Sequence, residues 1–264
     1  MNIGKLDRLI DIMKLLRSKD GCPWDREQTH ESLKRYLIEE TYEYLEVVDL
    51  DDKQRMCEEL GDVLLQVVFH AQIASENGDF NIEDVINGIC EKMIHRHPHV
   101  FGEVSAENSS EVLKNWEEIK KKEKGNLNQT SVLQDVPTNL PALMRSYKVQ
   151  QKAAQVGFDW DSPADVFAKI REEIDELEAE YKKSNKTGIE DELGDVLFSV
   201  VNLSRFLKVH PELSLSQSTN KFISRFEYVE NKADELNKKL SEMSLKEMDA
   251  LWAEAKMHKY GNNG

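Results

Sequence analysis

Acidic residues at helical spacing are the feature of this sequence best suited to chemistry. Glu40 and Glu43 are three positions apart, and so are Glu59 and Asp62. Residues three or four apart share one face of a helix, so each pair projects to one side. If the two helices pack antiparallel, the four carboxylates converge beside the core. Oxygen ligands of this kind suit a hard ion, Mg²⁺ or Mn²⁺.

Both acidic motifs return in the second half of the chain at a constant interval. The segment 39–43 (EETYE) returns as 172–176 (EEIDE), and 59–64 (ELGDVL) returns as 192–197, each 133 positions later. A pair of motifs repeated at fixed spacing indicates an internal duplication. The second set of candidate metal ligands is Glu173, Glu176, Glu192 and Asp195.

Shorter motifs repeat as well. The string GCPWD at 21–25 returns as GFDWD at 157–161. Basic and aromatic residues later in the first half have counterparts in the second: Lys92 and Arg96 correspond to Lys221 and Arg225, and Trp116 and Lys120 correspond to Trp252 and Lys256.

The acidic motifs have two plain alternatives to a magnesium site. A run such as EETYE is also typical of a solvated helix face, where like charges repel only weakly. Beside a core, clustered carboxylates are costly unless a cation neutralises them, and duplication of both motifs favours the metal site. A di-iron site is disfavoured because it needs Glu-x-x-His on two helices. The spacing leaves open whether Glu39 and Glu172 join the site or support it.

The elements that position these residues are predicted to be helices. Apolar residues recur at three- and four-residue intervals, and glycine and proline are few, with 12 and 6 in the chain. The helix carrying ELGDVL is apolar nearly all round beyond this motif, which predicts burial in a bundle. We predict no strand, and helices over 3–18, 29–49, 53–76, 82–96, 110–124, 141–156, 163–182, 188–209, 215–240 and 244–259.

The segment 125–141 (GNLNQTSVLQDVPTNLP) loses helical periodicity and gathers Gly, Asn and Pro. Such a composition is typical of a connection between domains. It is therefore predicted to link two helical domains, 1–124 and 142–264. The predicted fold class is all-α, a duplicated helical bundle.

Charge and composition narrow the classes of molecule that the protein is expected to bind. Acidic residues outnumber basic ones by 50 to 35, for a net charge of −15, so nucleic acid and anionic membranes are poor partners. A phosphate-bearing ligand can still bind where a divalent metal inverts the local charge. No long apolar run or signal-peptide pattern appears, which favours a cytoplasmic protein without membrane spans. Cys22, Cys57 and Cys90 show no CxxC spacing, so free thiols are expected.

A histidine group is the other candidate metal cluster. His95, His97 and His99 alternate along a segment broken by Pro98. This arrangement favours a structural or capping role over metal binding. The sequence has no P-loop motif and no arrangement typical of a serine hydrolase that would compete with the acidic motifs.

Longer strings connect the chain to a known family. GCPWDREQTH (21–30) and HRHPHVFGE (95–103), together with EETYE, ELGDVL and GFDWD, resemble the MazG family of nucleoside triphosphate pyrophosphohydrolases. The resemblance covers essentially the whole chain, in the two-domain form. It implies an all-α bundle completed by homodimerisation, in which the Glu-x-x-Glu and Glu-x-x-Asp motifs hold Mg²⁺. The ions then grip a nucleoside triphosphate.

The resemblance also implies substrate contacts in the second half. Lysine and arginine supply the cations that a triphosphate needs, and a tryptophan can stack any base. The alternative to substrate binding is that such basic residues are simply solvated on a helix surface and that the tryptophan is part of the hydrophobic core. Carried over by motif, the contacts are Lys169, Glu172, Lys221, Arg225, Trp252 and Lys256.

The expected reaction is attack of a metal-activated water on a phosphorus atom, giving nucleoside monophosphate and pyrophosphate. Glu172 and Glu173 form the expected catalytic set, with Glu172 a candidate for accepting the proton. The family implies that the second domain is the active one, although the first keeps every ligand. The second lacks the QTH string of the first, having Asp165 and Val166 in place of Thr29 and His30.

The family is consistent with broad base tolerance, with ribose and deoxyribose substrates, and with nucleotide-pool housekeeping or stress-alarmone control. Two rival interpretations remain at the level of sequence. One is a helical module that binds nucleotides or a protein without turnover, and the other is a phosphatase that releases free phosphate.

Overall fold

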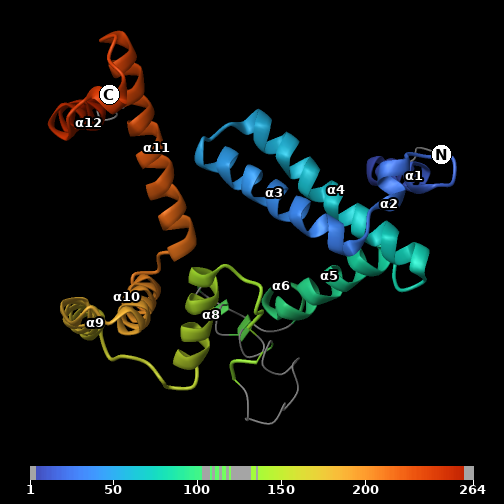
Figure 1. The fold of residues 1–264 in the computed structure, drawn as a ribbon. Coiled ribbons are helices and arrows are strands. Elements are labelled where there is room, and N and C mark those ends of the chain that lie inside the picture. Colours follow the sequence, from blue (N-terminus) through green and yellow to red (C-terminus); the bar gives the residue numbers. More distant parts are fainter. Residues whose placement is uncertain are drawn as a thin grey trace. The chain divides into compact units, whose positions relative to one another are not determined.

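The computed structural model divides the chain into two compact units, Met1–Asn126 and Leu127–Gly264. All regular secondary structure in the described residues is helical, which confirms the all-α fold class (Figure 1). Within these residues no helix combines the length and apolar character that a membrane crossing needs. The structure describes residues 4–102, 108, 111, 112, 115, 116, 119, 132–134 and 136–258.

Two predicted segments fall wholly or partly outside the described residues. Residues 125–131 and 135 of the predicted linker lie outside them, so the linker and the domain boundaries stay predictions. Of the helix predicted over 110–124, residues 111, 112, 115, 116 and 119 are described, and each is helical.

The first unit is built around a hairpin of two long helices. Thr29 caps the first of them, its hydroxyl accepting a hydrogen bond from the Ser32 amide. Asp51 adopts a positive φ of 55°, and Asp52 caps the second helix by accepting from the amides of Gln54 and Arg55. This tight turn makes the pair antiparallel. The helices of the unit are α1 (Lys5–Arg17), α2 (Pro23–Glu27), α3 (His30–Asp49), α4 (Lys53–Asn77), α5 (Ile82–Arg96) and α6 (Pro98–Phe101).

The second unit repeats this plan. Its hairpin, α9 and α10, begins 133 residues after α3 and α4, and Ser184 takes the positive φ, 53°, that Asp51 has in the first copy. Helix α8 has the 13-residue length of α1 and precedes the hairpin in the same way. The duplication predicted from sequence is therefore present in the fold. The helices are α8 (Ala142–Ala154), α9 (Pro163–Lys183), α10 (Lys186–Phe206), α11 (Pro211–Glu235), the short 3₁₀ helix η1 (Leu240–Glu242) and α12 (Leu245–His258).

Some predicted boundaries were wrong. Helix α11 begins at Pro211 and ends at Glu235, whereas 215–240 was predicted, because proline is well suited to a first helical turn. The short helices α2 and α6 were missed, since both are too short to show apolar periodicity.

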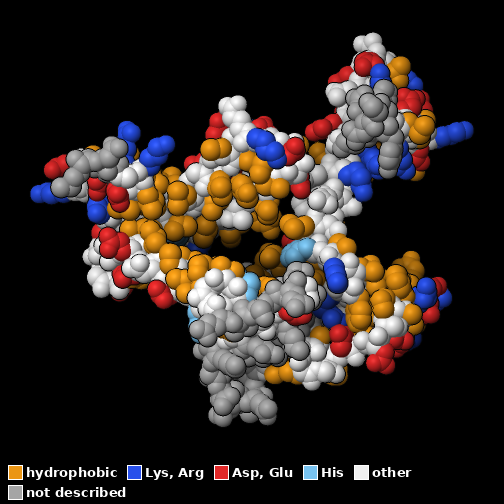
Figure 2. Space-filling model, turned by 180° about the vertical axis from the view of Figure 1, so that it is seen from behind, with side chains coloured by type: hydrophobic (Ala, Val, Ile, Leu, Met, Phe, Trp, Pro, Cys, Tyr) orange, Lys and Arg blue, Asp and Glu red, His pale blue; other side chains and the backbone are white. Residues whose placement is uncertain are grey.

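Helix α4 is buried on one side only, although its sequence predicted burial all round. Val68, Phe69 and Ile73 pack with Met13 and Leu33 in the first unit's core. On another side of α4, Leu60, Leu64 and Val67 are exposed. Their counterparts on α10, Leu193, Leu197 and Val200, are exposed too. Figure 2 shows hydrophobic side chains gathered over both hairpins. Each hairpin thus keeps an uncovered apolar stripe.

Candidate active site

The first acidic set lies on the α3–α4 hairpin. Glu40, Glu43 and Glu59 offer carboxylate oxygens that all lie within 4.8 Å of one another. Asp62, the fourth predicted ligand, stands outside this tight group. It is still close enough that its charge raises the pKa of Glu40. The hairpin therefore brings the predicted residues to one place.

The second acidic set lies on the α9–α10 hairpin. Here Glu173, Glu192 and Asp195 offer ligand oxygens within 4.8 Å of one another. Glu173 is buried, with 5% of its surface exposed, which makes it the most enclosed member. Glu176 stands outside the tight group, and its charge raises the pKa of Glu192.

Crowding of like charges gives both sets their electrostatic character. Desolvation raises the pKa of Glu40 above its ordinary value of 4.5, and neighbouring carboxylates, Asp62 first, raise it further. Desolvation raises the pKa of Glu192 in the same way, followed by the charge of Glu176. A hard divalent cation would relieve this repulsion, and the donors are the oxygens it prefers. The residues present therefore fit Mg²⁺.

This crowding predicts a stability gain from neutralising one carboxylate. In metal-free buffer, Glu192→Gln is expected to raise the melting temperature at neutral pH. Because the folded pKa of Glu192 lies above 4.5, the ionised group destabilises the fold above that pKa. Below 4.5 the wild-type group is protonated in both states, and the gain disappears. Thermal unfolding across this pH range in EDTA checks the prediction; an equal or lower melting temperature at pH 7 would contradict it.

The cations beside the two sets differ. Lys169 Nζ lies 2.8 Å from Glu172 Oε1 and 2.8 Å from Glu173 Oε1, and both contacts raise the pKa of the lysine. The first copy has Tyr36 at the position of Lys169. Its cation is Arg55 instead, 3.8 Å from Glu59. Among the described residues, a lysine contacts the second set, on its buried Glu173, and none contacts the first set.

The remaining predicted substrate contacts lie on other helices. Lys221 and Arg225 belong to α11, and Trp252 and Lys256 belong to α12. Trp252 packs against Phe222, with ring centroids 5.0 Å apart, and Arg225 lies 5.8 Å from the Trp252 centroid. Among the described residues, no hydrogen bond, ion pair or ring contact joins this group to the second acidic set.

The first copy repeats the arginine–tryptophan contact. The Arg96 guanidinium lies 5.4 Å from the centroid of Trp116. Lys92 lies on α5 with Arg96, whereas Lys120 lies outside the described residues. The repeat thus preserves a contact as well as residue types.

The histidine group is placed at a helix junction. His97 ends α5 and caps α6, and its Nδ1 is 2.6 Å from the Met93 carbonyl oxygen. Its ring packs edge-on against Trp116, with centroids 5.0 Å apart. These contacts are those of a capping residue, and no metal group includes this histidine among the described residues.

A cavity beside the second acidic set was not anticipated from the sequence. It has a volume of about 550 Å³ and lies between α8, α9, α10 and the loop before α9. Lys169, Glu173 and Asp195 line one part of it. The other lining residues include Gln150, Phe158, Trp160, Phe198 and Asn202.

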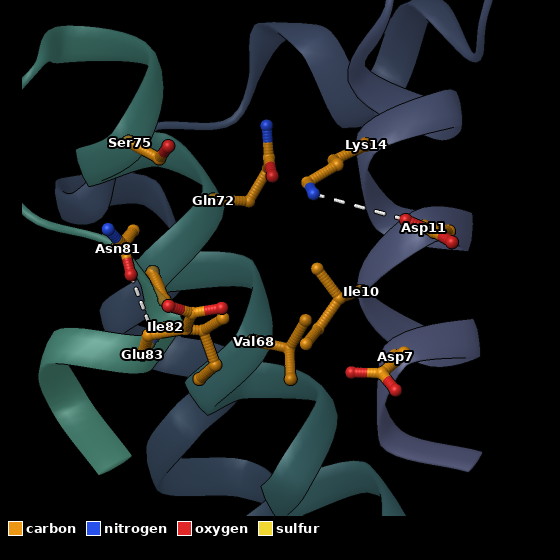
Figure 3. A pocket seen from close by; sticks show the side chains of 11 residues that line it. Asp7, Ile10, Asp11, Lys14, Val68, Gln72, Ser75, Asn81, Ile82 and Glu83 are labelled. Carbon is orange, nitrogen blue, oxygen red and sulfur yellow. Dashed lines mark hydrogen bonds and ion pairs between the residues drawn. The ribbon is translucent and has the colours of Figure 1, made fainter. Parts of the chain in front are cut away.

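The first unit has a smaller cavity in a different place. Its volume is about 350 Å³, and it lies between α1, α4 and the start of α5 (Figure 3). Lys14, paired to Asp11, and Gln72 face it. None of the four acidic ligands of the first copy lines it. Of these two cavities, that of the second unit adjoins an acidic set and that of the first unit does not.

Comparison with known families gives the geometry its context. The model of the MazG nucleotide pyrophosphohydrolase domain matches the chain twice, over residues 28–101 and 161–230. The two matches cover more than half of the chain, and each contains one complete acidic set. The chain belongs to the MazG family. The resemblance seen in the sequence motifs is thereby confirmed. Trp252 and Lys256 lie beyond the second match.

Two MazG relatives match nearly end to end. A nucleoside triphosphate pyrophosphohydrolase/pyrophosphatase MazG of Thermotoga maritima is 48% identical over 250 residues, covering 95% of each chain. A nucleoside triphosphate pyrophosphohydrolase of Escherichia coli is 43% identical over 257 residues, covering 96% of this chain and 98% of the relative. A solved MazG-related protein from Thermotoga maritima is 34% identical over 44% of this chain and 99% of its own, with a TM-score of 0.39.

Proposed function

We propose that this MazG-family enzyme hydrolyses nucleoside triphosphates to nucleoside monophosphate and pyrophosphate, with Mg²⁺, at the acidic set of its second unit. The relatives that match nearly end to end carry the name of this activity. One observation supports placing the reaction in the second unit. Lys169, Glu173 and Asp195 all line the same cavity, so an acidic set, a lysine and a cavity lie together there.

Each residue of the site has a distinct proposed role. Glu173, Glu176, Glu192 and Asp195 would hold the metal, which when bound neutralises phosphate charge and makes a water more acidic. Lys169, freed from one carboxylate, can turn its ammonium toward a phosphate oxygen. Glu172, more than half exposed, is placed to accept a proton from the attacking water. The new P–O bond forms at phosphorus while the bridging P–O bond breaks and pyrophosphate leaves.

A homodimer completes the site in this proposal. Lys221, Arg225, Trp252 and Lys256 have no contact with the second acidic set of their own chain among the described residues, so a second copy would supply them. The uncovered apolar stripe on α10 offers the surface for that copy. Gly194 supports the same view. A Cβ there would meet nothing within 4 Å in the single chain, so packing within the chain does not explain a mid-helix glycine, which costs about 1 kcal/mol relative to alanine. Close approach of a second copy would explain it.

Disrupting the stripe should therefore separate the copies. Leu197→Asp is expected to convert a dimer to a monomer and to lower pyrophosphate release by about 10-fold or more, because a charge in an apolar interface is strongly unfavourable. Light scattering coupled to gel filtration checks the mass. Leu245→Asp is the control, since Leu245 is 71% exposed at the start of α12. A monomeric wild-type protein with full activity would contradict the dimer.

We extend the proposal to substrates and setting. Broad tolerance of bases and of ribose or deoxyribose fits a site whose strongest contacts are to phosphates, as proposed here. The proposed setting is nucleotide-pool housekeeping or stress-alarmone control. The protein would act in the cytoplasm, where Mg²⁺ and these substrates are abundant.

Product analysis tests the proposed activity. The purified protein is incubated with Mg²⁺ and each common nucleoside triphosphate, and products are resolved by phosphorus NMR. We expect monophosphate and pyrophosphate in equal amounts. Free phosphate with nucleoside diphosphate would indicate a phosphatase, and binding without any product would indicate a regulatory module; either result would overturn the proposal.

A further inference from the structure

Two histidines of the first unit meet side by side where α3 begins. His30 is the first residue of α3, and His70 lies on α4. Their Nδ1 atoms are 2.8 Å apart, and their ring planes are parallel to within 3°. Parallel planes joined by a 2.8 Å contact are too close together for face-to-face stacking, so the rings meet edge to edge. One Nδ1 therefore donates a hydrogen bond to the other.

The gap between the two nitrogens fits a proton and not a metal ion. A metal bound between two imidazoles needs about 2.0–2.1 Å on each side. The 2.8 Å contact is much shorter than two such bonds placed end to end. No group of three metal-binding side chains includes either histidine among the described residues. The pair is therefore a site for a shared proton.

The far side of the His70 ring is closed to water. Its Nε2 is buried and has no hydrogen-bond partner in the part of the chain that the structure describes. Desolvation by burial lowers the pKa of His70 below its ordinary value of 6.5, and the charge of His30 lowers it further. When both rings are protonated, each Nδ1 carries a hydrogen and the bond between them is lost.

Other charged groups near the pair are bound to one another. Arg17 of α1 pairs with Glu76 of α4, with Nη2 2.7 Å from Oε2, and Lys34 pairs with Glu31 on the exposed side of α3. The pKa of Glu76 lies below its ordinary value of 4.5 because of the bond to Arg17, so this carboxylate stays ionised where a histidine titrates. Among the charged groups described on α1 to α5, the partner histidine alone shifts the pKa of His70.

The second unit shows that its hairpin does not need histidines at this place. Helix α9 begins at Pro163 as α3 begins at His30, so Pro163 rather than Val166 corresponds to His30 in the structure. The same offset of 133 residues places Leu203 at the position of His70. An apolar residue therefore suffices in one copy, whereas the other has a half-buried histidine whose outer nitrogen is unsatisfied.

We propose that His30 and His70 form a pH-sensitive clasp, which holds the first turn of α3 against α4 near neutral pH and releases it below about pH 6. This inference goes beyond the proposed hydrolysis and does not depend on it. In the released state His70 regains its ordinary pKa of 6.5, so that state binds more protons as the pH falls below 6.5, and the clasp loses stability. The release is local, because Arg17 still donates to the Gln28 carbonyl oxygen, at 3.2 Å.

Amide hydrogen exchange of the full chain at about pH 7.5 and 5.5 tests the clasp, with rates corrected for the intrinsic effect of pH. In the wild type we expect protection of residues 28–36 to fall about 5- to 10-fold on acidification, since one unit of pKa is a factor of ten. His70→Gln keeps a polar partner for His30 that does not titrate, and His70→Leu installs the residue of the second unit. In both variants we expect a fall of less than about two-fold.

Residues 161–169 are the control within the same sample, because they begin the equivalent helix of the second unit and contain no histidine. Their protection should not change with acidification. An equal acid-induced loss of protection at 28–36 in the wild type and in His70→Gln would overturn the inference, and so would an equal loss at 161–169. If His70→Leu does not fold, His70→Gln, which is closer to histidine in polarity, decides the test alone.

Discussion

Replacing Glu173 by glutamine is expected to lower pyrophosphate release by about 1,000-fold or more, because a metal ligand contributes several kcal/mol to stabilising the transition state. Glu173 is the most buried member of the second acidic set and also contacts Lys169 at 2.8 Å. Its replacement therefore removes a ligand and releases the lysine together. Initial rates with Mg²⁺ and ATP, monitored by a pyrophosphate-coupled assay, give the measurement.

Glu40→Gln is the matched variant in the first copy. Glu40 lies 133 positions before Glu173 and belongs to the equivalent set on α3 and α4. The cavity of the first unit lies away from that set, so we expect activity within about three-fold of wild type. Glu190→Gln is a second control, an exposed carboxylate on α10 outside the acidic set. Equal losses from Glu173→Gln and Glu40→Gln would contradict the assignment of activity to the second unit.

Removal of divalent metal is expected to abolish activity. Chelation by EDTA leaves the crowded carboxylates to repel the triphosphate, and the chain's net charge of −15 adds to that repulsion. We expect a loss of about 1,000-fold or more, restored by Mg²⁺ and by Mn²⁺, since both accept oxygen ligands. The measurement is the initial rate after dialysis against EDTA and after each ion is added back.

A binding measurement separates this effect from loss of fold. Circular dichroism in EDTA should show the helical content unchanged, because the helices and their caps do not depend on the ion. Calorimetry with Mg²⁺ alone should then report binding that Glu173→Gln weakens and Glu190→Gln does not. Full activity in EDTA would contradict a metal-dependent mechanism.

The sequence was most informative where chemistry depends on local spacing. Glu40 with Glu43, and Glu59 with Asp62, share helix faces whatever the tertiary fold, so their grouping followed from periodicity. Because both acidic motifs repeat 133 positions later, the same reasoning predicted the second set. The antiparallel hairpins that bring the pairs together follow from short turns, and in the first copy the helix cap at the turn, Asp52, is visible in the sequence.

The cavity could not be found in this way. Gln150 and Asn202 are ordinary helix residues in isolation, and they meet only because α8 packs against α10. Their signal was present in the repeat: an apolar position in one copy, Met13 or Phe69, is polar in the other. Comparing the copies position by position, beyond the conserved motifs, would have exposed it.

The burial predicted for α4 failed for a related reason. An apolar helix surface indicates that something covers it, but the sequence does not say whether the cover is the same chain. Leu60, Leu64 and Val67 are exposed in the single chain. A second copy remains the proposed cover.

A crystal structure with Mn²⁺ and an α,β-methylene nucleoside triphosphate tests the account most directly. Anomalous scattering locates the metal, and the blocked α–β bond keeps the substrate intact. We predict metal bound by Glu173, Glu176, Glu192 and Asp195, with the triphosphate against this metal and Lys169. Metal and nucleotide on the first acidic set alone, or a nucleotide bound without metal, would contradict it.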